Sequence, residues 1–135
     1  MARVTRVREL AGRLAVELHD DADVSYLEVR SLVDPAQALL LPLPAPPAID
    51  GLTLTTHLGR LHGLPWSLAW GAGTPPSGCL VELTTDAFRF RRTVTAEPRV
   101  LDGRCWVAVV EGAFATATTV VNGVETARVA IATRY

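Results

Sequence analysis

Apolar residues alternate with polar ones at a period of two along several short segments of this chain. Leu14, Val16 and Leu18 alternate with polar or small side chains, and a second alternating run follows a polar turn. Successive side chains of a β-strand point to opposite faces, so this period is typical of strands with one buried face. The pattern predicts an antiparallel hairpin over residues 13–31.

The beginning of the chain also allows a helical interpretation. Five apolar residues recur there at helical spacing: Val7, Leu10, Ala11, Leu14 and Leu18. Gly12 interrupts this set, and glycine in a helix interior costs about 1 kcal/mol relative to alanine. We therefore favour strands in this region, with a break or bulge near Gly12.

The clearest turn signal is Asn122-Gly123, which lies between β-branched runs. Both central residues of a type I′ turn need a positive φ, which asparagine and glycine tolerate. The sequence therefore predicts a C-terminal hairpin over residues 113–134. The expected cross-strand pairs are Val121 with Val124, Thr119 with Thr126, and Ala117 with Arg128. The face expected to pack on the core carries Phe114, Thr116, Thr118 and Val120 against Glu125, Ala127, Val129 and Ile131.

Turn signals recur about every ten residues along the chain, a spacing typical of sandwiches and barrels. Residues 105–110 are apolar on both faces, which predicts a central strand. The chain of 135 residues is long enough to bury a core without a metal or a disulfide. We therefore expect an all-β fold: a single-domain antiparallel β-sandwich or partly open β-barrel over residues 1–135.

A proline-rich stretch at residues 42–47, Pro-Leu-Pro-Ala-Pro-Pro, excludes a regular helix and a central strand. It is expected to run as an extended connector. It could also separate a small N-terminal hairpin unit from a larger C-terminal sheet. Before it, Asp34 suits an N-cap and Pro35 suits the first helical position. We therefore expect one short helix near residues 34–41.

Composition and charge exclude several classes of protein. All 13 cationic residues are arginine and the net charge is −1, so a nucleic-acid partner is not expected. No apolar run approaches the roughly 20 residues that span a bilayer, and no secretory signal is visible. We expect a cytoplasmic protein with no membrane partner. The preference for arginine over lysine suggests a GC-rich coding sequence, such as an actinobacterial genome or its phage.

The histidines do not form a recognisable metal motif. No Cys-x-x-Cys or His-Glu-x-x-His spacing is present among the three histidines and two cysteines. His19 is followed by Asp20, Asp21 and Asp23, but their spacing does not match a calcium loop, and a solvated hairpin turn explains them. We expect neither a metal nor another cofactor.

A catalytic cysteine is the weakest of the candidate sites. Cys79 with His57 or His62 would supply a nucleophile and a base, but nothing in its local sequence indicates an activated thiol. Cys79 and Cys105 are interpreted as two buried, apolar thiols. A disulfide between them stays open, although no export signal supports an oxidising compartment.

Two surface candidates remain. Trp66, Leu68 and Trp70 form a stripe on one strand face, which serves either as core, with Trp106 packed against the pair, or as a binding or oligomer surface. The second candidate is a basic cluster of three residues, Arg89, Arg91 and Arg92. The cluster either binds an anionic partner or makes cross-strand ion pairs with nearby acids, namely Glu82, Asp86 and Glu97.

These patterns favour a non-enzymatic accessory or assembly protein, bacterial or phage-encoded, that acts by association with a protein partner or with itself. One alternative is a small β-barrel ligand-binding protein or enzyme, with His57 or His62 as the acid–base group. Its pocket would be lined by Tyr26, Trp66, Trp70 and Trp106. A further alternative is a regulatory module that uses the basic patch at residues 89–92.

Overall fold

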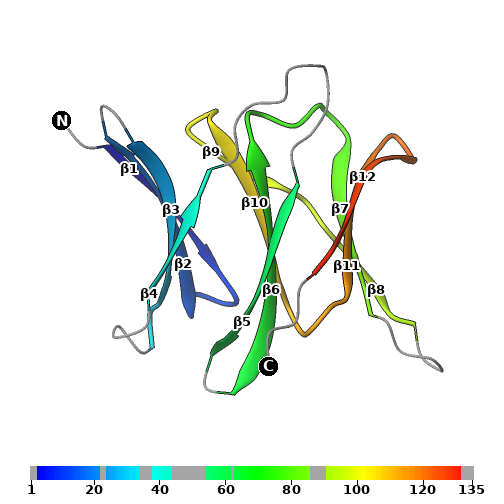
Figure 1. The fold of residues 1–135 in the computed structure, drawn as a ribbon, viewed down its shortest axis with the longest axis horizontal. Helices are drawn as coiled ribbons and strands as arrows, with labels where there is room; N and C mark the ends of the chain where they lie inside the picture. Colours follow the sequence, from blue (N-terminus) through cyan, green and yellow to red (C-terminus); the bar gives the residue numbers. More distant parts are fainter. Residues whose placement is uncertain are drawn as a thin grey trace. The chain divides into compact units, whose positions relative to one another are not determined.

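The structure is a computed structural model, and it describes residues 3–21, 24–33, 38–43, 54–61, 63–85 and 91–131. Within these residues every regular element is a β-strand, and the strands form three antiparallel sheets of four strands each (Figure 1). The all-β prediction is therefore confirmed. Each sheet has two separate edge strands, so none of them closes into a barrel. In this part of the chain no helix is long or apolar enough to cross a membrane.

The chain divides into two compact units, Met1–Pro44 and Ala45–Tyr135. The boundary falls within the proline-rich stretch 42–47. Residues 44–47 of the expected connector lie outside the described residues. The interpretation of the whole chain as a single domain stays a prediction.

The N-terminal unit contains one sheet, in the order β1-β2-β3-β4. Its strands are β1 (Arg3–Glu9), β2 (Leu14–Asp21), β3 (Val24–Ser31) and β4 (Ala38–Pro42). The hairpin predicted over residues 13–31 is confirmed, because β2 pairs with β3 from Leu14 opposite Ser31 to Asp21 opposite Val24. Strand β1 pairs with the other side of β2, so the helical alternative for the beginning of the chain is wrong.

The break predicted near Gly12 is the turn between β1 and β2. Leu10, Ala11 and Gly12 all have positive φ, at 54°, 56° and 82°. The carbonyl of Leu10 accepts the backbone N–H of Arg13 at 3.2 Å and the Arg13 Nε–H at 2.9 Å. The left-handed conformation is rarely adopted by residues other than glycine, so the two hydrogen bonds help to hold this turn.

The short helix expected near residues 34–41 is not present in the described residues, since residues 38–42 form β4 and residues 34–37 lie outside them. Leu39 and Leu41 lie opposite Val29 and Leu27 of β3, on the apolar face of the sheet. Leu40 points to the other face, opposite Glu28. Backbone pairing with β3 and the burial of alternate leucines therefore override the helical preference of the local sequence.

The C-terminal unit contains two sheets, in the orders β5-β6-β10-β9 and β12-β11-β7-β8. The first comprises β5 (Thr55–Leu61), β6 (Leu64–Ala72), β9 (Arg99–Leu101) and β10 (Cys105–Glu111). The second comprises β7 (Cys79–Thr84), β8 (Thr93–Ala96), β11 (Thr116–Val121) and β12 (Val124–Ala130). Strand β10 lies between β6 and β9, as its two apolar faces predict.

The two sheets of the C-terminal unit share one hydrophobic core. Its buried members come from both sheets: Ala69, Val81, Leu83, Trp106, Ala108, Phe114, Ala117 and Ile131. Ser67 is buried as well, and its hydroxyl donates to the Gly112 carbonyl at 2.8 Å and accepts the Phe114 N–H at 3.2 Å. This hydroxyl ties β6 to the segment that leads into β11, because a buried polar group needs partners.

The predicted C-terminal hairpin is present, with Asn122 and Gly123 at φ values of 50° and 81° in the turn. Val121 pairs with Val124 as expected, but the register then shifts between Thr119 and Val120. The extra residue is Thr126, whose Oγ1 lies 2.8 Å from Oγ1 of Thr119.

Because of this bulge, two of the predicted cross-strand pairs and one predicted core face are wrong. Thr119 lies opposite Ala127, and Ala117 lies opposite Val129, rather than opposite Thr126 and Arg128. Because the extra residue lies on β12, Ala117 rather than Thr116 shares a face with Val129, and Ala117 and Ile131 both belong to the core. Thr118 is buried, as expected. On β12 the expected face is correct at its C-terminal end, where Ile131 is buried.

Gly59 on β5 lies directly opposite Trp66 on β6, and the indole ring covers it. A Cβ atom added at Gly59 would overlap the ring atoms of Trp66. The absence of a side chain at Gly59 therefore leaves the space that the indole of Trp66 occupies.

We expect Gly59→Ala to lower the free energy of unfolding by about 1–3 kcal/mol, the usual cost of overpacking a filled site. Urea unfolding measures this, with Arg60→Ala as an exposed neighbouring control. Trp66→Leu removes the ring, so Gly59→Ala should cost less in that background. An equal cost in both backgrounds would show that the ring is not the obstacle.

Candidate functional site

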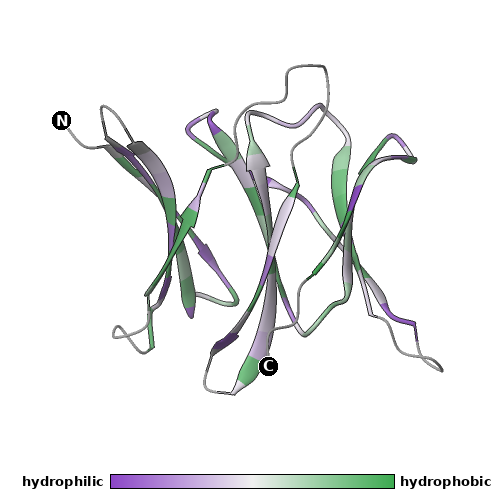
Figure 2. Cartoon of the chain, in the orientation of Figure 1, coloured by the Kyte–Doolittle hydropathy of each residue, from purple (hydrophilic) through white to green (hydrophobic). Residues whose placement is uncertain are grey.

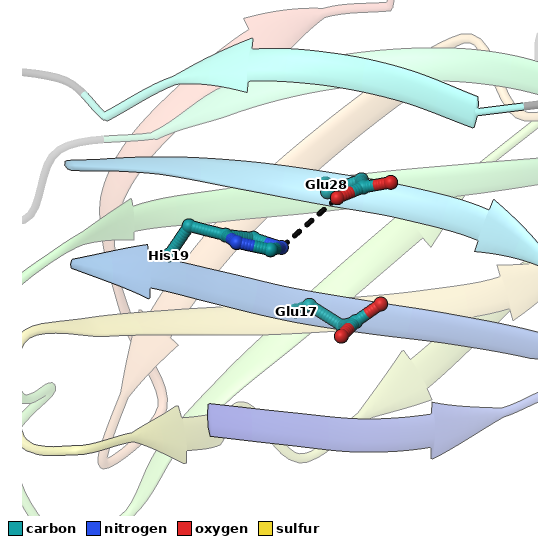
Figure 3. Close-up of side chains that lie close together, drawn as sticks. All are labelled: Glu17, His19 and Glu28. Carbon is teal, nitrogen blue, oxygen red and sulfur yellow. Dashed lines mark ion pairs between the residues drawn. The ribbon is translucent and has the colours of Figure 1, made fainter. Parts of the chain in front are cut away.

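Charged residues gather on one face of the N-terminal sheet. Glu17 and His19 share this face of β2, since they are two residues apart, and Glu28 of β3 lies directly opposite Glu17 (Figure 3). Like charges directly opposite each other destabilise a pair of strands. The two carboxylates therefore need compensating cations close by.

Two arginines neutralise Glu17. Arg6 of β1 donates from Nη2 to Oε2 of Glu17 at 3.1 Å, and Arg30 of β3 donates from Nη2 to Oε1. The side chain of Glu17 is only 3% exposed. Burial raises the pKa of Glu17, but hydrogen bonds and charge from Arg30 and Arg6 outweigh it, so its pKa lies below the usual value. Glu17 is thus an ionised carboxylate held between two neighbouring strands.

Glu28 contacts His19, and its Oε1 also lies 3.9 Å from Nε of Arg30. Nε2 of His19 lies 2.9 Å from Oε2 of Glu28, and the imidazole stacks on Tyr26 with ring centroids 4.9 Å apart and planes within 2°. Tyr26 lies opposite His19 in the register, so the stacking follows from strand pairing. Nε2 is buried and has no hydrogen-bond partner of good geometry, so its approach to Glu28 is a close contact without an aligned bond.

The ligand atoms of Glu17, His19 and Glu28 all lie within 4.8 Å of one another. Two carboxylates and an imidazole are donors that a transition metal accepts. The formal charges of Glu17 and Glu28 are balanced by Arg6 and Arg30. The cluster can therefore act as a neutral ion-pair network, and its imidazole nitrogen and carboxylate oxygens can also serve as ligands.

This cluster was not predicted from the sequence, because His19 was interpreted as part of a turn with Asp20 and Asp21. The signal was present in the predicted hairpin itself. Alternation places Glu17 and His19 on the polar face of one strand and Glu28 on the polar face of the other, and the structure supplies the register that sets Glu28 opposite Glu17. A search for chemistry-bearing residues on the polar face of the hairpin would have found all three.

The structure places the predicted tryptophan stripe on a buried surface. Trp66 and Trp70 are 5% and 3% exposed, and they share one face of their sheet. Val107 lies opposite Trp70, so its neighbour Trp106 points to the opposite face, into the core shared with the second sheet. The expectation that Trp106 packs against the pair is therefore wrong, because the two sets lie on different sides of one sheet.

His57 is the predicted acid–base residue that the structure places beside an aromatic ring. Its ring centroid lies 5.9 Å from that of Trp66, with the planes tilted by 49°. Cys79 begins β7 on the other sheet of this unit, whereas His57 lies on β5. His62, the other predicted base, lies outside the described residues.

Both cysteines are free and buried, so the disulfide that the sequence left open is not formed. Burial raises the pKa of the Cys79 thiol. Burial also raises the pKa of Cys105 to about 11, although the charge of Arg104 opposes part of this effect. The nucleophilic form of a cysteine is the thiolate, so neither environment activates its thiol at neutral pH.

The basic cluster is described only in part. Arg91 and Arg92 are exposed just before β8, whereas Arg89 lies outside the described residues. The backbone N–H of Arg92 donates to Oγ1 of Thr85 at 2.8 Å, and its carbonyl accepts the Thr85 N–H at 2.9 Å. These bonds fix the main chain at Arg92 and leave its side chain in solvent.

Comparison with known proteins gives no relative from which a function can be transferred. No protein-family model matches the chain, and no curated protein and no solved structure is significantly similar to it. The function is therefore inferred from the residues of this chain and their geometry.

We expect Glu17→Gln to lower the free energy of unfolding by about 1.5–3 kcal/mol at neutral pH, the usual worth of hydrogen bonds to a charged group. The ionised form is favoured by folding, so this stabilisation is present above the ordinary glutamate pKa of 4.5 and is lost as the pH falls through the lowered folded value. Denaturant unfolding of both proteins from pH 7 to pH 3 measures the difference.

The matched control is Glu125→Gln, which weakens an exposed ion pair with Arg128 and should cost much less. A gap between wild type and Glu17→Gln that stays constant with pH, or widens in acid, would contradict this assignment.

Proposed function

We propose that the protein is a non-enzymatic accessory or assembly protein that acts by association, and that it pairs with a second copy of itself along the edge of β4 that faces away from β3. The observation that carries this proposal is the character of that edge. Strand β4 contains no charged residue, and most of it lies at the hydrophobic end of the colour scale in Figure 2. Leu40 at its centre is 64% exposed. In the described residues no strand pairs with the far side of β4.

The opposite edge of the same sheet has a different character. Strand β1 carries three arginines and a glutamate within its seven residues. Charged side chains protect an edge strand from pairing with another chain, and an apolar edge without them invites it. The contrast between the two edges favours β4 as the one that accepts another strand.

The sequence of β4 is complementary to itself. In an antiparallel pair centred on Leu40, each Leu40 would lie opposite its copy and Leu39 would lie opposite Leu41. Leu39 and Leu41 share one face of the sheet, so this register joins apolar face to apolar face. Pro42, which lacks an N–H, stays at the end of the strand, where it is tolerated. Such a twofold arrangement is the commonest form of self-association.

Other features of the molecule also support a protein that acts by association. Two sheets that share one core support the assignment of a β-sandwich to the C-terminal unit. Exposed apolar side chains also occur on the edge strands β1, β9 and β12, at Val4, Val100 and Val124. Both thiols are free, which agrees with a cytoplasmic location where thiols stay reduced.

We expect the protein to be a dimer by light scattering after size-exclusion chromatography, and Leu40→Lys to be a monomer. The substitution places two ammonium groups opposite each other in the dimer, and within one chain the lysine lies opposite Glu28, so the sheet itself should tolerate it.

The matched control is Leu64→Lys, which changes another exposed leucine, 51% exposed, at the start of the interior strand β6. This variant should remain a dimer. A wild-type protein that stays monomeric at all concentrations, or a Leu40→Lys variant that still dimerises, would overturn the proposal.

A further inference from the structure

We propose that Glu17, His19 and Glu28 form a binding site for a single transition-metal dication, with Zn²⁺ as the best fit. The site requires only one chain, so it goes beyond the proposed self-association at β4. The three donors come from two paired strands, β2 and β3, and their ligand atoms lie within 4.8 Å of one another. Zinc binds at about 2.0–2.2 Å from nitrogen and oxygen donors, so small side-chain rotations would bring all three to one ion.

Strand pairing holds the donors in place before any ion binds. Glu17 and Glu28 are register partners, and residues directly opposite each other have Cβ atoms about 4.5–5.5 Å apart. His19 is the next residue of β2 on the same face. The stacked Tyr26 ring restrains the plane of the imidazole. Figure 3 shows Nε2 of His19 directed at Glu28.

The position of Nε2 of His19 is the second observation that points to a cation. Its Nε2 atom is buried beside a carboxylate oxygen at 2.9 Å and has no hydrogen-bond partner. A protonated Nε2 is attracted to that oxygen, whereas an Nε2 that carries only its lone pair is repelled by it. A cation between the two atoms turns this repulsion into two favourable contacts, because both atoms are then donors to it.

The choice of metal follows from the donors. Calcium takes six to eight oxygen ligands and magnesium requires octahedral oxygen coordination, so an imidazole and two carboxylates suit neither. Imidazole is a good ligand for zinc, copper and nickel, and three protein donors leave one position of a tetrahedral zinc site open.

Arg6 and Arg30 are expected to lower the affinity of the site for a metal ion, but they leave lone pairs of Glu17 available to bind it. Each donates to one oxygen of Glu17, and a carboxylate oxygen has two lone pairs, so one remains on each atom. Their positive charge repels a dication, which makes removal of one arginine a diagnostic change. Arg6 is the better choice, because Arg30 then continues to neutralise the buried Glu17.

The experiment is calorimetric titration of the full-length chain, without an affinity tag, with Zn²⁺, together with Co²⁺ absorption in the visible range. We expect one metal per chain. Affinity should fall by at least about 10-fold in His19→Gln and in Glu28→Gln, since loss of even an outer-shell partner costs that much. Arg6→Gln should bind more tightly than wild type, because it removes a competing cation.

The control is His57→Ala, which changes a histidine of the C-terminal unit and should leave the affinity unchanged. Far-ultraviolet circular dichroism identifies any variant that fails to fold, and the Arg6→Gln prediction has the opposite sign, so unfolding cannot imitate it. The site would be ruled out if wild type showed no saturable binding, or if both His19→Gln and Glu28→Gln still bound the metal as wild type does. It would also be ruled out if folded Arg6→Gln bound the metal no more tightly than wild type.

Discussion

A carboxylate removed from water must be neutralised where it lies, and the N-terminal sheet depends on how Glu17 meets this requirement. Its two cations come from the strands on either side, Arg6 of β1 and Arg30 of β3. One side chain therefore ties three strands together. A slip of one residue would move Glu17 to the apolar face, so the network opposes a change of register.

The proposed metal site and the proposed self-association at β4 both involve the polar face of the N-terminal sheet. Glu28 lies opposite Glu17 on one side and opposite Leu40 of β4 on the other. It contacts His19 within the cluster, and it borders the apolar edge where a second copy would add. The polar face thus contains a fixed charge cluster at its centre and an exposed leucine beside it. This layout suits binding and assembly, since both use side chains that strand pairing already holds in position.

Alternation was sufficient to predict the β2–β3 hairpin, and Asn122-Gly123 was sufficient to predict the last turn. The register beyond that turn was not predictable, because the bulge at Thr126 adds one residue to β12 without a local signal and sets Val129 rather than Arg128 opposite the buried Ala117. Strand β4 was mistaken for part of a helix because its pairing with β3 is a tertiary effect. The charge cluster was missed because Glu28 meets Glu17 and His19 only once two strands are set side by side.

The central claim is that Glu17 is buried and ionised between two arginines. The most direct measurement is the titration of its side-chain carboxyl carbon by NMR as the pH is lowered. This account predicts a midpoint below the ordinary glutamate value of 4.5, because hydrogen bonds and charge from Arg30 and Arg6 outweigh the effect of burial. A midpoint at or above 4.5 would contradict the account, since burial would then outweigh the arginines.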